Sequence, residues 1–105
     1  RDYARLGLFA MHDGVLPDST RVLPQGWMEE STSPSSSNAG YGYMWWLQDH
    51  GGYAASGIFG QRIYVNPQER LVIAQHAALE AAVDAEQRAV QPAMEAALVR
   101  ALAGR

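Results

Sequence analysis

Residues 52–66, with the sequence GYAASGIFGQRIYVN, are the part of the chain whose residue types best suit contact with a ligand. Ala55, Ser56 and Gly57 carry little side chain, and an alternation of polar and apolar residues typical of a strand follows them. Glycine and alanine allow a ligand or a second chain to come close to the backbone. Two interpretations stay open from these residues alone: a place of close approach, or a tight turn before a strand.

The serines do not form a nucleophilic site by themselves. Ser56 lacks the glycine two positions before it that a nucleophile elbow requires. Ser35, Ser36 and Ser37 lie in a polar stretch with no base nearby in the sequence. The chain has no lysine, so no Ser-x-x-Lys pair occurs. We therefore predict that this chain alone carries no complete Ser–Lys or Ser–His–Asp site.

Metal and cofactor sites are not predicted either. His12, His50 and His76 are far apart in the sequence, and no two of them have ligand spacing on one helix face. The chain has no cysteine, which excludes disulfides and thiolate ligands. We expect no metal and no cofactor.

The bulk composition limits the other classes of partner. A chain of 105 residues, 48% of them hydrophobic, suits one small domain with a core. The formal charge of -3 and the scattered basic residues give no electrostatic footprint for nucleic acid. No apolar run approaches the length of a membrane span. We expect neither nucleic acid nor a membrane as a partner.

The elements that must position the small-residue stretch follow from periodicity and turn chemistry. Helices are predicted over residues 2–13 and 24–32, and strands over residues 41–48, 61–66 and 70–76. A final helix begins near Asp84, and Pro92 is expected to kink or restart it. Its apolar stripe consists of Val90, Met94, Ala97, Leu98, Ala101 and Leu102.

This order of elements predicts an α+β fold, an antiparallel three-stranded meander flanked by helices. The apolar run in residues 70–76 suits a strand that is covered on both faces. We expect helices on both sides of the sheet, and an exposed sheet edge where further strands attach.

The aromatic segment could line a pocket. Tyr41, Tyr43, Trp45 and Trp46 supply large rigid surfaces, although alternating aromatics on a strand are more often core. Adjacent tryptophans on a strand point to opposite faces, so we expect at least one to be free for a ligand or a neighbouring segment.

The succession of motifs resembles a known family. GLFAMHDGV, RVLPQGWMEEST, GYGYMWWL and GIFGQRIYVNPQERLVIAQHA occur in this order, and the order resembles the C-terminal part of serine hydrolases of the β-lactamase superfamily. The similar branch contains class C β-lactamase-like esterases and nylon-oligomer hydrolases. The resemblance runs from about Leu6 to the final helix. It implies that residues 1–105 are an incomplete domain, part of a larger β-lactamase-like α/β/α sandwich.

The resemblance also implies which catalytic parts are present. The family's Ser-x-x-Lys pair and its Tyr-x-Asn motif normally lie upstream of the matched region, and this sequence does not contain them. Tyr64-Val65-Asn66 fits the second pattern only by chance, because it falls in a later strand.

The best match to the family's Lys-Thr-Gly-like triplet is Ala55-Ser56-Gly57, followed by Ile58. By this resemblance, the Ile58 backbone N–H would be one donor of an oxyanion hole, and Ser56 would be a hydroxyl that faces the substrate. Alanine replaces the family's lysine at position 55, which disfavours penicillin-type substrates and favours esters or amides. We expect the triplet, Trp45 and Trp46 to contact the substrate.

Two hypotheses follow. In the first, the chain is the C-terminal segment of a serine hydrolase acting on a small ester or amide through an acyl-enzyme. It needs the missing N-terminal part of the same domain and is inactive alone. In the second, the chain is a self-contained, non-catalytic α+β module that binds a partner through its sheet edge or through the surface at Trp45 and Trp46.

Overall fold

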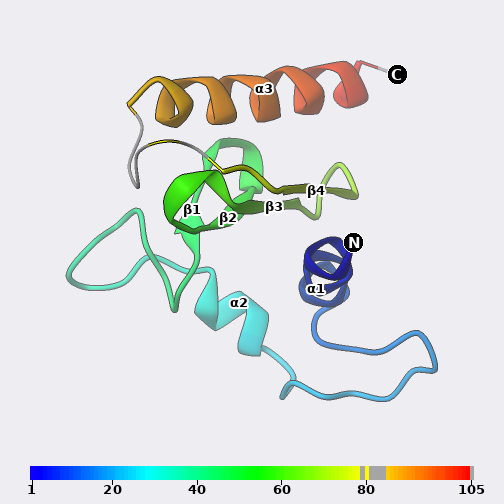
Figure 1. Ribbon diagram of the computed structural model, residues 1–105. Coiled ribbons are helices and arrows are strands. Elements are labelled where there is room, and N and C mark those ends of the chain that lie inside the picture. Colours follow the sequence, from blue (N-terminus) through cyan, green and yellow to red (C-terminus); the bar gives the residue numbers. More distant parts are fainter. Residues whose placement is uncertain (79, 81–84, 105) are drawn as a thin grey trace.

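The computed structural model describes residues 1–78, 80 and 85–104. Its four strands form one antiparallel sheet in the order β1-β2-β3-β4. Figure 1 shows α1 and α2 on one side of this sheet and α3 on the other. The elements are α1 (Asp2–Met11), α2 (Trp27–Ser31), β1 (Trp46–Leu47), η1 (Asp49–Gly51), β2 (Tyr53–Ser56), η2 (Ile58–Gly60), β3 (Arg62–Asn66), β4 (Leu71–Gln75) and α3 (Ala85–Ala103).

The predicted α+β class is confirmed, with four strands where the sequence predicted three. The additional strand is β2, which pairs with β1 on one side and with β3 on the other. Its small residues favour a turn by local preference, but a ladder on both sides and the burial of Tyr53 and Ala54 override that preference. The predicted strand over residues 41–48 shrinks to β1, because Met44 before it has a positive φ of 64°.

β3 is one of the two inner strands, and each of its residues is buried. Ile63 and Val65 point towards α1 and join its core cluster, whereas Tyr64 points to the other face and packs against Val99 of α3. Alternate residues of β3 thus belong to two separate hydrophobic cores, one on each face of the sheet. Complete burial of Val65 alone stabilises the fold by about 1.5–3 kcal/mol.

α1 approaches the sheet closely because it has a glycine at the contact. A Cβ on Gly7 would lie 2.5 Å from Cγ1 of Val72 and 3.2 Å from Cγ2 of Ile63. Any side chain here would push the helix away from β3 and β4. The glycine therefore sets the distance between the helix and the sheet.

The turn from β3 to β4 lies between the strands predicted over residues 61–66 and 70–76, and Asn66 holds it. The Asn66 side-chain oxygen accepts a hydrogen bond from the Glu69 backbone N–H at 3.1 Å. The Asn66 amide nitrogen donates to the His50 carbonyl and to the Tyr64 hydroxyl, both at 3.2 Å. These bonds tie the end of β3 to η1, beside the start of β2.

α3 continues through Pro92 as one helix, so the predicted restart does not occur there. Glu95 and Val99 face the sheet and are buried, whereas Val90, Met94 and Leu98 of the predicted apolar stripe are 49%, 40% and 40% exposed. The outer side of this helix is therefore apolar. Its predicted start at Asp84 lies outside the described residues.

Candidate functional site

The predicted site residues lie where β2 ends. Ser56 is the last residue of β2, Gly57 is extended with φ -101° and ψ 168°, and Ile58 begins η2. The chain then reverses through two residues with positive φ, Phe59 at 60° and Gly60 at 99°. This tight reversal brings the chain into β3 and leaves Ile58 61% exposed at its outer corner.

The Ile58 backbone N–H has no acceptor among the described residues. Its neighbour differs, because the Gly57 N–H donates to the Gln61 carbonyl at 2.8 Å and closes the reversal. A backbone donor that has no protein acceptor and is held at a fixed corner is the type of group that an oxyanion hole requires.

Side-chain amides hold the reversal from outside. Gln61 Nε2 donates to the carbonyl of Ala77, which follows β4, at 3.2 Å. Gln91 Nε2 of α3 donates to the Gly60 carbonyl at 3.3 Å. The loop after β2 is thus anchored to the sheet and to α3, so the direction of its backbone groups is fixed.

A buried ionic network lies under Ser56. Arg62 at the start of β3 binds Glu95 of α3 in two places, Nε to Oε2 at 2.6 Å and Nη2 to Oε1 at 2.7 Å. Its Nη1 donates to Ser56 Oγ at 2.6 Å, and Nη2 also donates to Gln48 Oε1 at 3.3 Å. One guanidinium therefore joins the ends of three strands to α3.

Sequence reasoning missed this network. Arg62 stands opposite Ser56 in the β2–β3 register, which a correct assignment of β2 would have shown. Glu95 lies 33 residues away from Arg62, and no local pattern connects the two. The one available signal was a single acidic residue between Met94 and Ala96 in an otherwise apolar stretch.

The two tryptophans do point to opposite faces, as predicted. Trp45 is 4% exposed and belongs to the core on the α1 side, with its ring edge-on to Tyr53 at 4.9 Å. Trp46 is 44% exposed and packs on Tyr41 at 4.5 Å. Of the pair, Trp46 is the one that offers a surface to a ligand.

Strand alternation separates the remaining predicted residues. Ala55 is half-buried against the core on the α1 side, whereas Ser56 points to the α3 side with Arg62. Trp46 pairs with Ala54 in the sheet, two residues from Ser56, so Trp46 and Ser56 share that face. Of the predicted site residues, Ser56 and Trp46 thus lie on the face towards α3, whereas Ala55 packs against the core on the α1 side.

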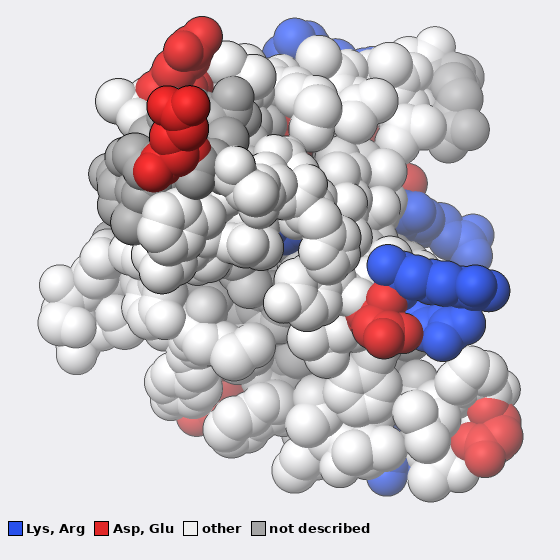
Figure 2. Space-filling model, in the orientation of Figure 1, with Lys and Arg blue, Asp and Glu red and all other residues white. Residues whose placement is uncertain are grey.

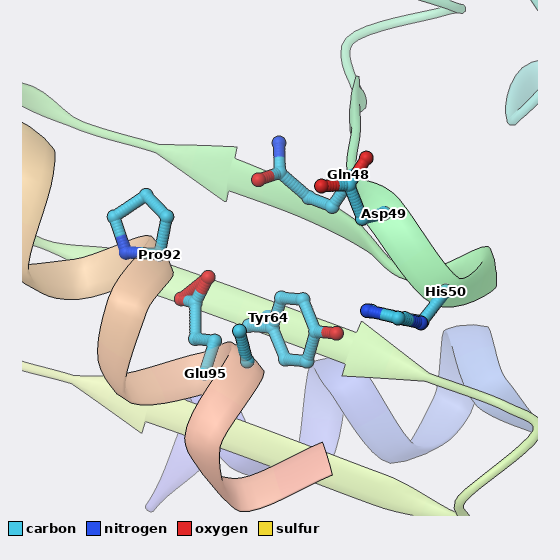
Figure 3. Close-up of a pocket in the computed structure, with 7 residues that line it drawn as sticks. Gln48, Asp49, His50, Tyr64, Pro92 and Glu95 are labelled. Carbon is cyan, nitrogen blue, oxygen red and sulfur yellow. The ribbon is translucent and has the colours of Figure 1, made fainter. Parts of the chain in front are cut away.

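A small cavity lies between α3 and the turn from β1 to β2, as Figure 3 shows. It has a volume of about 50 Å³ and is lined by Gln48, Asp49, His50, Tyr64, Pro92, Glu95 and Ala96. Pockets for small ligands have volumes of about 300–1,000 Å³. This cavity has room for water rather than for a substrate, and Ser56 and Ile58 do not line it.

Comparison of the sequence with known proteins identifies a family for this chain. The profile of the family described as Beta-lactamase matches residues 1–96, most of the chain. The chain belongs to the β-lactamase family. The predicted membership of this superfamily of hydrolases is thereby confirmed.

One relative in the β-lactamase family is the 6-aminohexanoate-dimer hydrolase of Paenarthrobacter ureafaciens. It is 31% identical over 88 residues, which cover 70% of this chain and 22% of the relative. The chain thus spans about a fifth of the length of the relative that it matches.

The histidine, tyrosine and asparagine side chains that could take part in catalysis or metal binding elsewhere in this β-lactamase-family chain lie apart from the predicted site. Nδ1 of His12 donates to the Leu8 carbonyl at the end of α1 at 2.8 Å, and the His76 ring stacks on Tyr3 at 4.7 Å. Tyr64 and Asn66, the chance match to the Tyr-x-Asn motif, are buried in β3. Within the described residues, no group of three or more metal-binding side chains is placed to hold an ion.

Charge is sparse around the molecule. Figure 2 shows a largely uncharged face on which basic and acidic side chains lie in small separate groups. In the part of the chain that the structure describes, no helix is both long enough and apolar enough to cross a bilayer. In the core, burial and the nearby Asp13 carboxylate raise the pKa of Tyr53 to about 12.

Proposed function

We propose that residues 1–105 are the C-terminal segment of a serine hydrolase of the β-lactamase superfamily, which cleaves esters or amides through an acyl-enzyme. The observation that carries this proposal is the Ile58 N–H, a donor without an acceptor among the described residues, directly after Ala55-Ser56-Gly57 at the end of β2. The nucleophile and its lysine belong to the part of the domain that these residues do not contain, so the segment alone is inactive.

In this proposal the segment stabilises negative charge. The nucleophile attacks the substrate carbonyl, and the carbonyl oxygen becomes negative in the tetrahedral intermediate. The Ile58 N–H and the N–H of the nucleophile donate to that oxygen. Loss of one such donor typically lowers kcat by about 10²–10³-fold, or about 2.7–4 kcal/mol of barrier.

Two observations favour ester or amide groups as substrates. The chain has Ala55 where the family's lysine would bind a substrate carboxylate, and Arg62 beneath Ser56 is already paired with Glu95. The relative is named as a hydrolase of a 6-aminohexanoate dimer, and two amino acids joined in this way are linked by an amide. We therefore propose both amides and esters as substrates.

The apolar outer side of α3 supports a larger domain. Val90, Met94 and Leu98 are spaced by four residues, so they form one row on the helix, and each is at least 40% exposed. A contiguous apolar row on a protein surface usually marks a contact with another segment or chain. In this proposal the N-terminal part of the same domain covers it.

The experiment compares the 105-residue chain with a longer product of the same gene that includes the upstream region. Chromogenic esters and anilides serve as substrates, and we expect turnover from the longer protein alone. In that protein, Ile58→Pro removes the N–H, and the extended backbone of Gly57 is compatible with a following proline. We expect kcat to fall about 10²-fold or more in this variant, with Ile58→Val as the matched control that keeps the donor.

Two results would contradict the proposal. One is turnover by the 105-residue chain that Ser56→Ala abolishes, because the nucleophile would then lie within this chain. The other is a folded Ile58→Pro variant with unchanged kcat.

The alternative function, a non-catalytic binding module, is favoured by Trp46, which is 44% exposed on the edge strand β1. If it is correct, the 105-residue chain is monodisperse and unfolds cooperatively without the upstream region. A chain that aggregates alone and becomes soluble in the longer product contradicts it.

A further inference from the structure

The contacts of Arg62 fix the chemical role of the Ser56 hydroxyl. A guanidinium has hydrogen-bond donors and no acceptor. In the 2.6 Å contact between Arg62 Nη1 and Ser56 Oγ, the serine oxygen must therefore accept. The hydroxyl hydrogen of Ser56 stays available, and no described residue accepts it. Ser56 is thus presented as a donor at the open end of β2.

Glu95 holds the guanidinium in the orientation that this contact needs. Its carboxylate takes Nε and the nearer hydrogen of Nη2 at 2.6 and 2.7 Å, which leaves Nη1 for Ser56. A bidentate pair between two planar groups has one favoured geometry, unlike a pair with a lysine. The side chains of Arg62 and Glu95 are 9% and 4% exposed, so water does not compete for these bonds.

The pair also determines the charge beneath Ser56. Arg62 and Glu95 cancel, so the serine is polarised by a nearby donor without an unpaired cation. A hydroxyl whose oxygen already accepts a charge-assisted hydrogen bond becomes a better donor. The acceptor that fits such a group is an oxygen lone pair on the substrate.

We propose that Arg62, held by Glu95, is a positioning residue that presents the Ser56 hydroxyl as a hydrogen-bond donor to a carbonyl oxygen of the substrate. This inference rests on the proposed hydrolase function. Arg62 and Glu95 do not touch the substrate, and they act through Ser56. If Arg62 and Glu95 only joined β3 to α3, the effect of removing them on activity would not depend on the presence of Ser56.

The experiment is a mutant cycle in the longer, active protein. The Arg62→Met/Glu95→Met double variant removes the pair without leaving a buried charge unpaired, a replacement that is often neutral for stability. It is made with Ser56 and with Ser56→Ala, and kcat/KM is measured on one chromogenic substrate. We expect Ser56→Ala to lower kcat/KM about tenfold, and the double variant to lower it about fivefold when Ser56 is present.

The decisive expectation is that the double variant changes kcat/KM by less than about twofold in the Ser56→Ala background, because neighbours that act through one contact are not additive. Equal losses in the two backgrounds would overturn the inference, and so would no loss with Ser56 present. If the double variant does not fold, Arg62→Lys takes its place. It keeps a positive charge beside Glu95 but loses the planar guanidinium that reaches Ser56. We expect it to lower kcat/KM when Ser56 is present and to change it by less than about twofold in the Ser56→Ala background.

The failure of this inference can be told from failure of the proposed function. An active parent protein with an additive cycle overturns the role of Arg62 alone. A longer protein that folds and hydrolyses neither esters nor amides overturns the proposed function, and this inference with it.

Discussion

Replacement of Arg62 by methionine should be strongly destabilising, because it leaves Glu95 buried and charged without its two donors. The Glu95 side chain is 4% exposed, and both of its carboxylate oxygens bind the guanidinium at 2.6 and 2.7 Å. Removal of one partner from a buried ion pair typically costs about 3–5 kcal/mol. This exceeds the usual cost of a point substitution, about 0.5–3 kcal/mol.

The assay is urea unfolding of the longer protein, followed by tryptophan fluorescence. With a urea dependence of about 2 kcal/mol/M, a loss of 4 kcal/mol lowers the midpoint by about 2 M. Arg5→Met is the matched control. The Arg5–Asp2 pair is 3.6 Å long with side chains 66% and 94% exposed, so its loss should change stability by less than about 0.5 kcal/mol.

The double variant Arg62→Met/Glu95→Met separates the cost of an unpaired charge from the loss of attraction. We expect it to recover most of the lost stability, because two apolar side chains of similar length fill the same space. The reasoning is refuted if the single Arg62→Met substitution costs less than about 1 kcal/mol. It is also refuted if the double variant is as unstable as the single one.

Three further predictions concern the core and the surface. Gly7→Ala should cost about 1–3 kcal/mol in urea unfolding, since its Cβ would meet Val72 Cγ1 at 2.5 Å, and Val72→Ala should recover part of it. The pKa of Tyr53, raised to about 12 in the folded protein, should make stability fall as pH rises from about 10 to 12, because the folded state keeps a proton that the unfolded state releases. Tyr53→Phe should remove that pH dependence, and an unchanged pH profile contradicts the assignment. Met94→Glu should destabilise the longer protein by about 2 kcal/mol if another segment covers α3, and equal stability of the two forms would mean that the row stays in water.

The local elements with a strong period could be predicted from sequence. Ile63 and Val65 alternate with polar neighbours, and the structure gives each residue of β3 the face that this alternation predicts for it. The gap between the strands predicted over residues 61–66 and 70–76 matches the observed turn, in which the Asn66 side chain accepts from the Glu69 backbone N–H. Helix α1 ends at Met11, two residues before its predicted end at Asp13.

β2 could not be predicted from local preference. Ala54, Ala55 and Ser56 have low strand preference, and glycines flank β2 on both sides. Their strand conformation comes from the ladders with β1 and β3, which are contacts between segments. Because β2 was not recognised as a strand, the pairing of Ser56 with Arg62 was not visible, and Arg62 was missed as the partner of the Ser56 hydroxyl.

In α3 the apolar stripe was visible in the sequence, but the sequence did not show which face of the helix packs against the sheet. The stripe that contains Val90, Met94 and Leu98 is the face that amphipathic reasoning would turn towards the sheet. The structure turns Glu95 inwards instead, because Arg62 on β3 supplies a partner for its charge and burial without that partner would be prohibitive. The apolar row of Val90, Met94 and Leu98 is then left on the outside, where each residue is at least 40% exposed. One buried ion pair thus connects the rotation of the helix, the orientation of Ser56 and the outward position of the apolar row, so these three features should change together when the pair is removed.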